Sequence, residues 1–296
     1  MTTAIGIDLG ATHIKFVHLD SGGALLAGGS FPTDDKPGAS WPQRIRDQIT
    51  HLQKENPTDR IGICAPGLAA RDGRSIVWMQ GRLNQVQGLE WTSYLTSTRT
   101  IPVLNDAHAA LLGEVWKGAA VAAQNAVLLT LGTGVGGAIL VDGKLLHGHI
   151  GRAGHLGHIS LDTQGSPDIV KTPGSLENAI GDCTIQQRTA GRFTSTRDLV
   201  AAHRAGDKYA TDIWLRAVRD LAAGITSIIN MIDPEIIIIG GGIAAAGDAL
   251  FYPLRNYLDE MEWRPLGDAV KIVPAKLGDL AGAIGAAYNA MENSET

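Results

Sequence analysis

The chain has 296 residues, and its 44% hydrophobic and 19% charged residues with 37 glycines are typical of a globular protein with a substantial core. This composition excludes a disordered chain. The formal net charge of −5, without a basic tail or basic helix, argues against binding to nucleic acid or to a membrane surface.

Targeting and redox signals are sparse. Residues 1–8 lack a basic region and reach a charged residue too early for a signal peptide. The least polar stretch, residues 126–141, contains four glycines and therefore predicts two strands, not a membrane span. Cys64 and Cys183 are too few for a disulfide framework and fit no metal-ligand spacing. We therefore expect a cytoplasmic protein whose thiols are reduced.

Apolar spacing in the first part of the chain predicts a strand meander, then helices alternating with strands. The predicted elements are strands at 4–9, 14–19, 25–31, 61–65 and 101–104, and helices at 39–54, near 93–97 and from 105 onward. Strands followed by a helix and a further strand indicate an α/β layer. Asn105 is a suitable N-cap for the third helix. Its predicted apolar face consists of Ala107, Ala110, Leu111 and Val115.

The second part of the chain repeats this alternation. The predicted elements are strands at 127–129, 138–141, 235–239 and 270–273, and helices at 175–180, 184–190, 196–205, 207–232, 248–261 and 281–291. Residues 163–174 are predicted to form a loop because they contain two prolines and two glycines. The long helix is predicted to bury a stripe of Ile213, Ala217, Leu221, Ile225, Ile228 and Ile232.

Three glycine turns follow predicted strands. Residues 8–15 and 130–137 both place a Leu-Gly turn between two strands, and residues 240–242 are three consecutive glycines after a buried strand. A turn without β-carbons lets a charged group approach the backbone N–H groups. Each hairpin alone has a purely structural alternative. Two matching hairpins suggest two domains of related topology facing each other across a cleft, with phosphates between them and a base near the third turn.

Five motifs, in order over essentially the whole chain, resemble the ROK (repressor, open reading frame, kinase) family of sugar kinases, which has the actin-like ATPase fold. They are the phosphate motifs at 8–12 and 131–134, the adenosine motif at 238–242, Asn105-Asp106-Ala107 with Gly113-Glu114, and the stretch from Gly148 to His158. The resemblance implies a two-lobed α/β fold of the actin-like (ribonuclease H-like) type, with a cleft between lobes. The implied lobes are residues 1–104, joined by the C-terminal helix at about 281–296, and residues 105–280.

The implied activity is transfer of the γ-phosphoryl group of ATP to a hydroxyl, expected to be the 6-hydroxyl, of a hexose or hexose derivative. Asp106 matches the general base that such a hydroxyl needs. The implied sugar contacts are Gly67, Asn105, His155, His158 and Glu177. The implied nucleotide contacts are Asp8, Gly10, Thr12, Lys15, Gly132, Thr133, Gly134, Gly241 and Gly242. Asp8 would also hold Mg²⁺, through water. The family resemblance further suggests a homodimer.

The sequence departs from the family pattern at three places. Relatives commonly carry a cysteine-rich zinc motif after the histidine that matches His158, but residues 159–177 contain no cysteine, so we expect no zinc site. His155 stands where relatives have glutamate, which removes a negative charge and leaves the sugar identity open. Arg82 stands where relatives have asparagine and, like Arg152, adds a cation that either meets an anionic sugar or faces solvent.

Two further functions compete with the kinase. A transcriptional repressor of this family needs a helix-turn-helix domain, and the sequence begins directly with the first predicted strand, so we do not expect one. A catalytically silent sugar-binding or sensor protein is the other alternative. It would be favoured if the protein bound a sugar but transferred no phosphate. The histidines at 147, 149, 155 and 158 could in principle hold a metal, but their spacing without an acidic neighbour favours ordinary hydrogen bonding.

Overall fold

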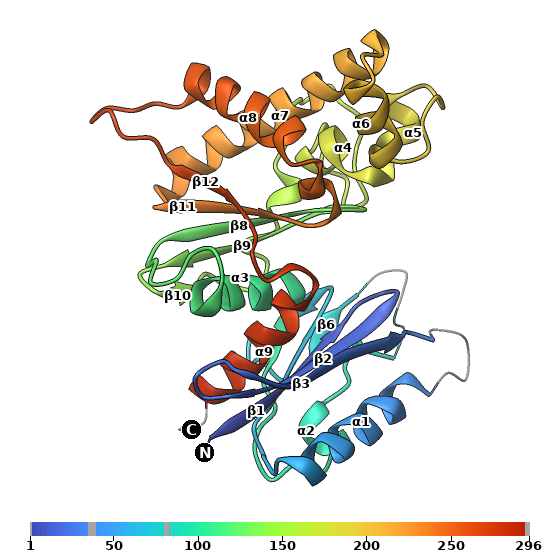
Figure 1. The fold of residues 1–296 in the computed structure, drawn as a ribbon, viewed down its shortest axis with the longest axis vertical. Coiled ribbons are helices and arrows are strands. Elements are labelled where there is room, and N and C mark those ends of the chain that lie inside the picture. Colours follow the sequence, from blue (N-terminus) through green and yellow to red (C-terminus); the bar gives the residue numbers. More distant parts are fainter. Residues whose placement is uncertain (1, 35–39, 80–82, 84, 294–296) are drawn as a thin grey trace. The chain divides into compact units, whose positions relative to one another are not determined.

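The computed structural model describes residues 2–34, 40–79, 83 and 85–293. The chain forms two compact units (Figure 1). Unit 1 consists of Met1–Ala122, Leu145–Ala153 and Lys276–Thr296, and unit 2 of Ala123–Lys144 and Gly154–Ala275. Each unit has its own sheet and its own hydrophobic core.

Unit 1 is built on a five-stranded sheet of order β3-β2-β1-β4-β7. Its strands are β1 (Thr3–Leu9), β2 (His13–Asp20), β3 (Leu25–Pro32), β4 (Ile61–Ala65) and β7 (Val103–Asn105). The first three pair antiparallel, which confirms the predicted meander, and β1, β4 and β7 are parallel. Its helices are α1 (Trp41–Glu55), α2 (Trp91–Tyr94), α3 (Asp106–Lys117) and α9 (Ala281–Glu292).

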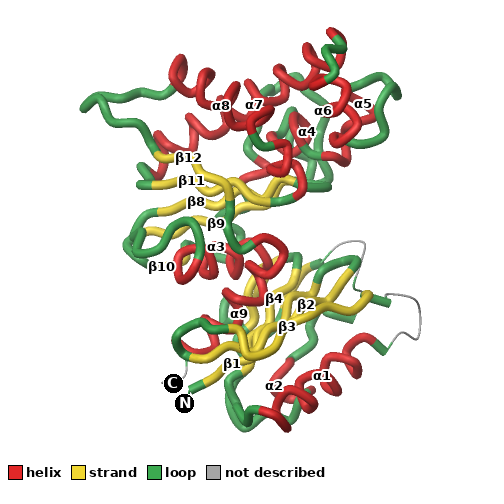
Figure 2. Tube along the Cα trace, in the orientation of Figure 1, coloured by secondary structure: helices red, strands yellow, loops and turns green. Residues whose placement is uncertain are grey.

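The strand alternation of β1 places helices on both faces of this sheet (Figure 2). Ile5, Ile7 and Leu9 share a core cluster with the apolar face of α1, whereas Ala4 packs with α9. The α9 backbone comes so close that a β-carbon at Gly6 would lie 1.9 Å from the carbonyl oxygen of Ala283. Glycine is therefore required where α9 crosses β1.

Helix α3 belongs to unit 1 by its contacts. A β-carbon at Gly285 of α9 would lie 1.6 Å from the carbonyl oxygen of Ala109, so the two helices touch through their smallest residues. The sequence-based division at residue 104 separates α3 from these partners, whereas the compact unit extends to Ala122. The predicted apolar face of α3 was wrong in part for the same reason. Ala110 and Val115 are only partly buried, while Ala109, Gly113 and Glu114 are buried.

Unit 2 repeats the topology of unit 1. Its sheet has the order β10-β9-β8-β11-β12, with β8 antiparallel to β9 and parallel to β11, and β11 parallel to β12. The strands are β8 (Ala126–Leu131), β9 (Val135–Val141), β10 (Lys144–Leu145), β11 (Ile236–Gly240) and β12 (Lys271–Pro274). The strand order, and the directions of β9, β8, β11 and β12, match those of unit 1, so the two units have related topology.

The helices of unit 2 are α4 (Leu176–Ile180), α5 (Ile185–Arg188), α6 (Thr196–Arg204), α7 (Lys208–Ile232) and α8 (Asp248–Met261). Short 3₁₀ helices lie at Leu156–His158, Asp182–Thr184 and Gly242–Ala246. Helix α7 buries the predicted stripe from Ala217 to Ile228, with Ile213 and Ile232 packed at its ends, and adds Trp214, which donates from Nε1 to the carbonyl oxygen of Ala249 at 2.8 Å.

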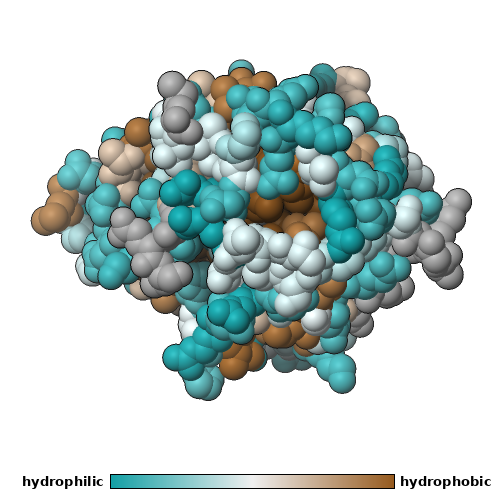
Figure 3. Space-filling view, turned by 90° about the horizontal axis from the view of Figure 1, so that it is seen from below, coloured by the Kyte–Doolittle hydropathy of each residue, from teal (hydrophilic) through white to brown (hydrophobic). Residues whose placement is uncertain are grey.

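Small elements escaped prediction. The strands β5 (Leu68–Ala69) and β6 (Ile76–Trp78) form a separate two-stranded sheet within a turn-rich region. Helix α2 begins at Trp91 instead of residue 93, because the Glu90 carboxylate caps it by accepting from the Ser93 N–H at 2.7 Å. Among the described residues, no helix is both long and apolar enough to cross a membrane. Figure 3 shows one face of the molecule, on which apolar residues form small separate patches.

Candidate functional site

The register of the parallel strands in unit 1 gathers polar side chains at one sheet edge. Asp8 on β1 lies beside Cys64 on β4, and Ala65 on β4 lies beside Asn105 on β7. These positions lie at the carboxyl ends of three adjacent parallel strands, where α/β sheets place their ligands. Asp106, the first residue of α3, follows directly. The structure therefore brings together the predicted Mg²⁺ residue Asp8, the predicted sugar residue Asn105 and the predicted base Asp106.

The surroundings of Asp8 disfavour its ionised form. Its pKa is raised to about 6, first by burial and next by the negative charge of Asp106, against opposing effects of Lys15 and the Cys64 thiol. Lys15 Nζ lies 4.0 Å from Asp8 Oδ2, and the thiol donates to Oδ1 at 3.6 Å. One ammonium group at that distance does not cancel two carboxylates. A hard cation with oxygen ligands fits this donor set, because it would offset the repulsion.

Hydrogen bonds hold both the oxygen and the nitrogen of the Asn105 side-chain amide. Its Oδ1 accepts from the backbone N–H groups of Ala107 and His108, at 2.9 and 3.3 Å, and so caps α3. Its Nδ2 donates to the carbonyl oxygen of Gly67 at 3.0 Å. Gly67 has φ 101°, and a β-carbon there would lie 2.5 Å from the carbonyl oxygen of Trp78. Two predicted sugar contacts, Gly67 and Asn105, are thus hydrogen-bonded neighbours.

The first glycine turn forms a separate pocket of about 460 Å³ in unit 1. It is lined by Gly10, Ala11, Thr12, His13, Lys15, Ser30 and Asp279. The end of β3 supports the turn, because Thr33 donates from its hydroxyl to the carbonyl oxygen of Gly10 at 2.7 Å and from its N–H to that of Thr12 at 2.8 Å. Asp279, which precedes the helix predicted at 281–291, was not among the predicted site residues, yet its charge also contributes to the raised pKa of Asp8.

In unit 2 the other two glycine turns touch each other. A β-carbon at Gly241, which has φ 85°, would lie 2.3 Å from the carbonyl oxygen of Leu131 at the end of β8. Gly132 and Gly242 have open space around their missing β-carbons. The two turns are neighbours because the parallel strands β8 and β11 end side by side.

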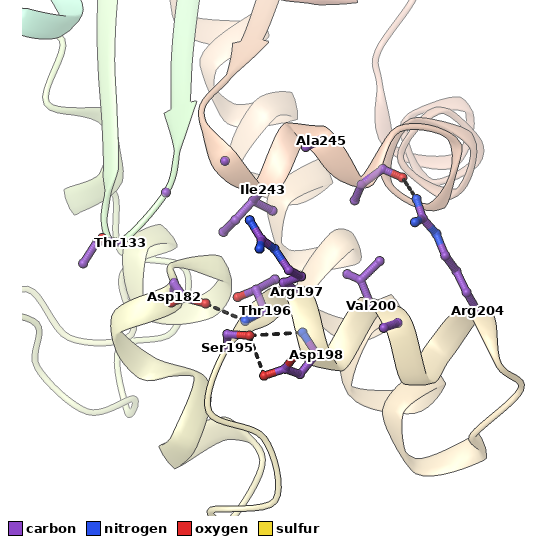
Figure 4. A pocket seen from close by; sticks show the side chains of 14 residues that line it. Thr133, Asp182, Ser195, Thr196, Arg197, Asp198, Val200, Arg204, Ile243 and Ala245 are labelled. Atoms are coloured by element: carbon purple, nitrogen blue, oxygen red, sulfur yellow. Dashed lines mark hydrogen bonds between the residues drawn. The ribbon is translucent and has the colours of Figure 1, made fainter. Parts of the chain in front are cut away.

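A pocket of about 660 Å³ opens beside these two turns (Figure 4). Its lining residues are Gly132, Thr133, Asp182, Ser195, Thr196, Arg197, Asp198, Val200, Ala201, Arg204, Gly242, Ile243, Ala245 and Ala246. The contribution of α6 was missed, although the serine before it was available as an N-cap signal. Ser195 accepts from the Asp198 N–H at 3.1 Å, and the Thr196 N–H donates to Asp182 Oδ1 at 2.5 Å. The size and mixed lining suit a nucleoside.

Glu177 supports the second glycine turn. Its Oε2 accepts from the Val135 N–H at 3.0 Å. Two backbone hydrogen bonds also hold the turn, from Asp182 N–H to the Gly132 carbonyl and from Cys183 N–H to the Thr133 carbonyl, at 2.9 and 2.8 Å. The structure thus places Glu177 against the predicted nucleotide residues. Its predicted contact with sugar stays a prediction.

The loop after His158 is organised by a carboxylate. His158 Nδ1 lies 2.8 Å from Asp168 Oδ2, and Asp168 Oδ1 accepts from the N–H groups of Val170 and Thr172 at 3.0 and 2.8 Å. A zinc ion held by this loop would need thiolates or further imidazoles. The residues present do not fit such an ion, because residues 159–177 contain no cysteine and no second histidine. Among the described residues, no group of three metal-binding side chains is assembled.

The remaining histidines are divided between the units. His147 packs edge-on against the ring of the buried His108, with centroids 5.2 Å apart, and burial lowers the pKa of His147. His155 precedes the 3₁₀ helix that contains His158. Arg152 is exposed, and Arg82 lies outside the described residues. The predicted site residues thus form one group in unit 1 and one in unit 2, the latter including His155, His158 and Glu177.

Comparison with known proteins gives a consistent result. The ROK family model matches residues 4–293. A glucokinase of Halalkalibacterium halodurans is 29% identical over 316 residues, covering 96% of this chain and 93% of its own. A ROK hexokinase structure from Thermus thermophilus has a TM-score of 0.84 at 28% identity, over 99% of this chain and 100% of its own. A ROK family glucokinase from Streptomyces griseus, in complex with glucose and AMPPNP, has a TM-score of 0.79 at 25% identity, over 98% and 100%.

Proposed function

The chain belongs to the ROK family and has the actin-like ATPase fold, and we propose that it is an ATP-dependent kinase acting on a hexose or hexose derivative. The single observation that carries the proposal is the pair of carboxylates, Asp8 and Asp106, at the carboxyl ends of β1 and β7, where burial and the charge of Asp106 raise the pKa of Asp8. A catalytically silent sugar-binding protein does not require two acids at the cost of mutual repulsion. The similarity to glucokinases supports the same activity.

We assign Asp106 the role of general base. A sugar hydroxyl that attacks the γ-phosphate must lose its proton, and a carboxylate within hydrogen-bond reach accepts it. The side chain of Asp106 is held at the start of α3, where its Oδ1 accepts from the Ala107 N–H at 2.9 Å. Asn105 and Gly67, the proposed sugar contacts of unit 1, lie in the same unit as Asp106. His155 and His158 are the proposed sugar contacts of unit 2. The 6-hydroxyl stays the expected acceptor.

The nucleotide is proposed to use the glycine turns. Gly132, Thr133, Gly134, Gly241 and Gly242 would face the phosphates and adenosine, with the 660 Å³ pocket for the nucleoside. Gly10, Thr12 and Lys15 would meet the phosphates in unit 1. Asp8 would hold Mg²⁺ through water, and that ion would neutralise charge on the transferring phosphoryl group.

A coupled ADP-release assay with MgATP tests the proposal on a panel of neutral, amino and acidic sugars. We expect turnover on one class, with Asp106→Asn lowering kcat by about a hundredfold or more and leaving the sugar KM nearly unchanged. The control is Asp47→Asn, an exposed acid on α1. Equal turnover in the Asp106 variant would remove the base assignment. ATP binding without turnover on any sugar would favour the silent sensor. The expected homodimer is tested separately by measuring the molar mass with light scattering during size-exclusion chromatography.

A further inference from the structure

The carboxylate of Asp168 is the centre of the loop between the 3₁₀ helix at Leu156–His158 and α4 in unit 2. Its side chain is fully buried, although its neighbours Ile169 and Val170 are exposed. The turn closes around it, because Asp168 N–H donates to the Thr172 carbonyl at 2.9 Å while Oδ1 accepts from Val170 and Thr172. The hairpin-like pairing of Pro167 with Pro173 surrounds this turn. A buried acid with this many donors is a built feature of the loop.

The second oxygen of the same carboxylate fixes which tautomer the neutral His158 ring adopts. Burial alone raises the pKa of Asp168, but hydrogen bonds from His158, Thr172 N–H and Ser175 outweigh it, so the pKa is lowered and the acid is ionised near neutrality. An ionised carboxylate can only accept, so Nδ1 of His158 must carry the proton. In the neutral ring Nε2 is then an acceptor. The ring keeps 28% of its surface exposed, so it is not sealed inside the loop.

We propose that Asp168 is a positioning residue for substrate binding: it orients His158 and fixes its tautomer so that Nε2 accepts a hydrogen bond from a sugar hydroxyl. The inference rests on the proposed kinase function and deepens it. Asp168 therefore has two roles: its Oδ1 orders the loop, and its Oδ2 orients His158. Neither role needs a cysteine, and residues 159–177 contain none.

The substitution Asp168→Asn separates the two roles, because it keeps the acceptor at Oδ1 and replaces the acceptor at Oδ2 by a donor. The amide carbonyl of asparagine can replace Oδ1 and keep the bonds from Val170 and Thr172, so the loop stays folded. The NH₂ group then faces His158 and can only donate, which forces Nδ1 to be an acceptor and moves the ring proton to Nε2. If Asp168 has only a structural role, the variant should fold and bind sugar nearly as the wild type does. If Asp168 has the proposed role, His158 loses the acceptor for the sugar hydroxyl and sugar binding weakens.

The first measurement is the ¹⁵N NMR signature of the His158 ring in the full chain. We expect the neutral ring to be protonated at Nδ1 in the wild type and at Nε2 in Asp168→Asn, with melting temperatures within a few degrees. Asp162→Asn is the matched control, since Asp162 lies in the same loop but bonds only the exposed turn at Gln164 among the side-chain hydrogen bonds described. An unchanged tautomer in Asp168→Asn, or protonation at Nε2 in the wild type, would overturn the proposal.

The second measurement is steady-state kinetics on the sugar that the wild type phosphorylates. We expect Asp168→Asn to raise the sugar KM about tenfold, with the KM for ATP unchanged, because one hydrogen bond in the site is lost. Asp168→Glu, which keeps the charge, should recover part of this loss. An unchanged sugar KM would overturn the proposal. If the wild type has no kinase activity the NMR result still stands, and sugar affinity by calorimetry replaces KM, so the two failures are distinguishable.

Discussion

The carboxylate of Glu177 lies where a side chain at position 134 would have to be: a β-carbon on Gly134 would come within 2.4 Å of Glu177 Oε2. The glycine of the second phosphate turn is therefore required by an internal contact, whatever binds outside it. The same oxygen accepts from the buried Val135 residue, one position further along the chain. The side chain of Glu177 thus connects helix α4 to the turn by a hydrogen bond.

Replacing Glu177 by alanine should weaken nucleotide binding more than sugar binding. The Val135 N–H would lose its acceptor, which costs about 1–3 kcal/mol, and the turn would no longer be held for the phosphates. We expect the KM for ATP to rise about tenfold while the KM for sugar stays within about twofold. Both constants come from one coupled ADP-release assay with each substrate varied in turn.

Glu177→Gln is the matched control, because its side-chain oxygen can still accept from Val135. We expect it to remain near the wild type for ATP. A rise of the sugar KM in both variants, with ATP unaffected, would instead support the contact with sugar that the sequence suggests. The experiment therefore decides between two roles for the same acid.

Asp8 should make the protein without Mg²⁺ less stable as the pH rises. Its folded-state pKa of about 6 lies above the ordinary value of 3.8, so the folded state holds more protons between these values. Stability is then lost as the pH rises from about 4 to 6, by on the order of 3 kcal/mol. Asp8→Asn removes this loss. In EDTA we expect the variant to melt above the wild type at pH 7.5 and level with it at pH 4.

Mg²⁺ and nucleotide at saturating concentrations should reduce the difference in melting temperature between Asp8→Asn and the wild type at pH 7.5. The reason is that the cation favours the ionised carboxylate, which only the wild type has. The control is Asp59→Asn, which removes an exposed acid paired with Arg99 at 2.8 Å and should show no such pH window. A wild type that melts above Asp8→Asn at pH 7.5 in EDTA would contradict the raised pKa. Thermal unfolding followed by circular dichroism measures all three proteins.

Much of the fold was predictable because the apolar period is strong in the long elements. Strand β1, the buried run of β11 and the stripe of α7 each bury what the sequence pattern indicates. The α3 face was not predictable, since the packing of α3 depends on a glycine in α9 far along the chain. The strands β5 and β6 are two and three residues long, too short to produce a period.

The site was predictable where a motif coincides with a strand end. Asp8, Asn105 and the glycine turns satisfy that condition. The α6 residues of the 660 Å³ pocket and Asp168 do not, because neither α6 nor the loop of Asp168 carries a recognised motif or follows directly on a strand. A lone aspartate among exposed loop residues carries no sign in the sequence that its carboxylate is buried. Only the hydrogen bonds to Val170 and Thr172 reveal it.

Glu114 illustrates a motif residue whose function is structural. It is fully buried, and Oε1 accepts from the N–H groups of Lys276 and Leu277 at 2.9 and 2.8 Å while Oε2 accepts from Ala119 at 2.6 Å. The carboxylate thereby joins the end of α3 to the segment that leads into α9. Three donors around one acid suit a charged acceptor, because bonds to a charged group are stronger than neutral ones.

Glu114→Gln should therefore destabilise unit 1 without a direct effect on chemistry. The amide NH₂ would face either Ala119 or the Lys276–Leu277 pair, so at least one buried N–H group loses its acceptor, at about 2–3 kcal/mol. We expect the melting temperature to fall by about 5–10 °C, with kcat and both KM values near those of the wild type at a temperature where the variant is folded. Glu55→Gln, on the exposed end of α1, is the control and should change neither. A loss of kcat at full folding would instead mean that the join between α3 and α9 transmits its geometry to Asp106, at the other end of the same helix.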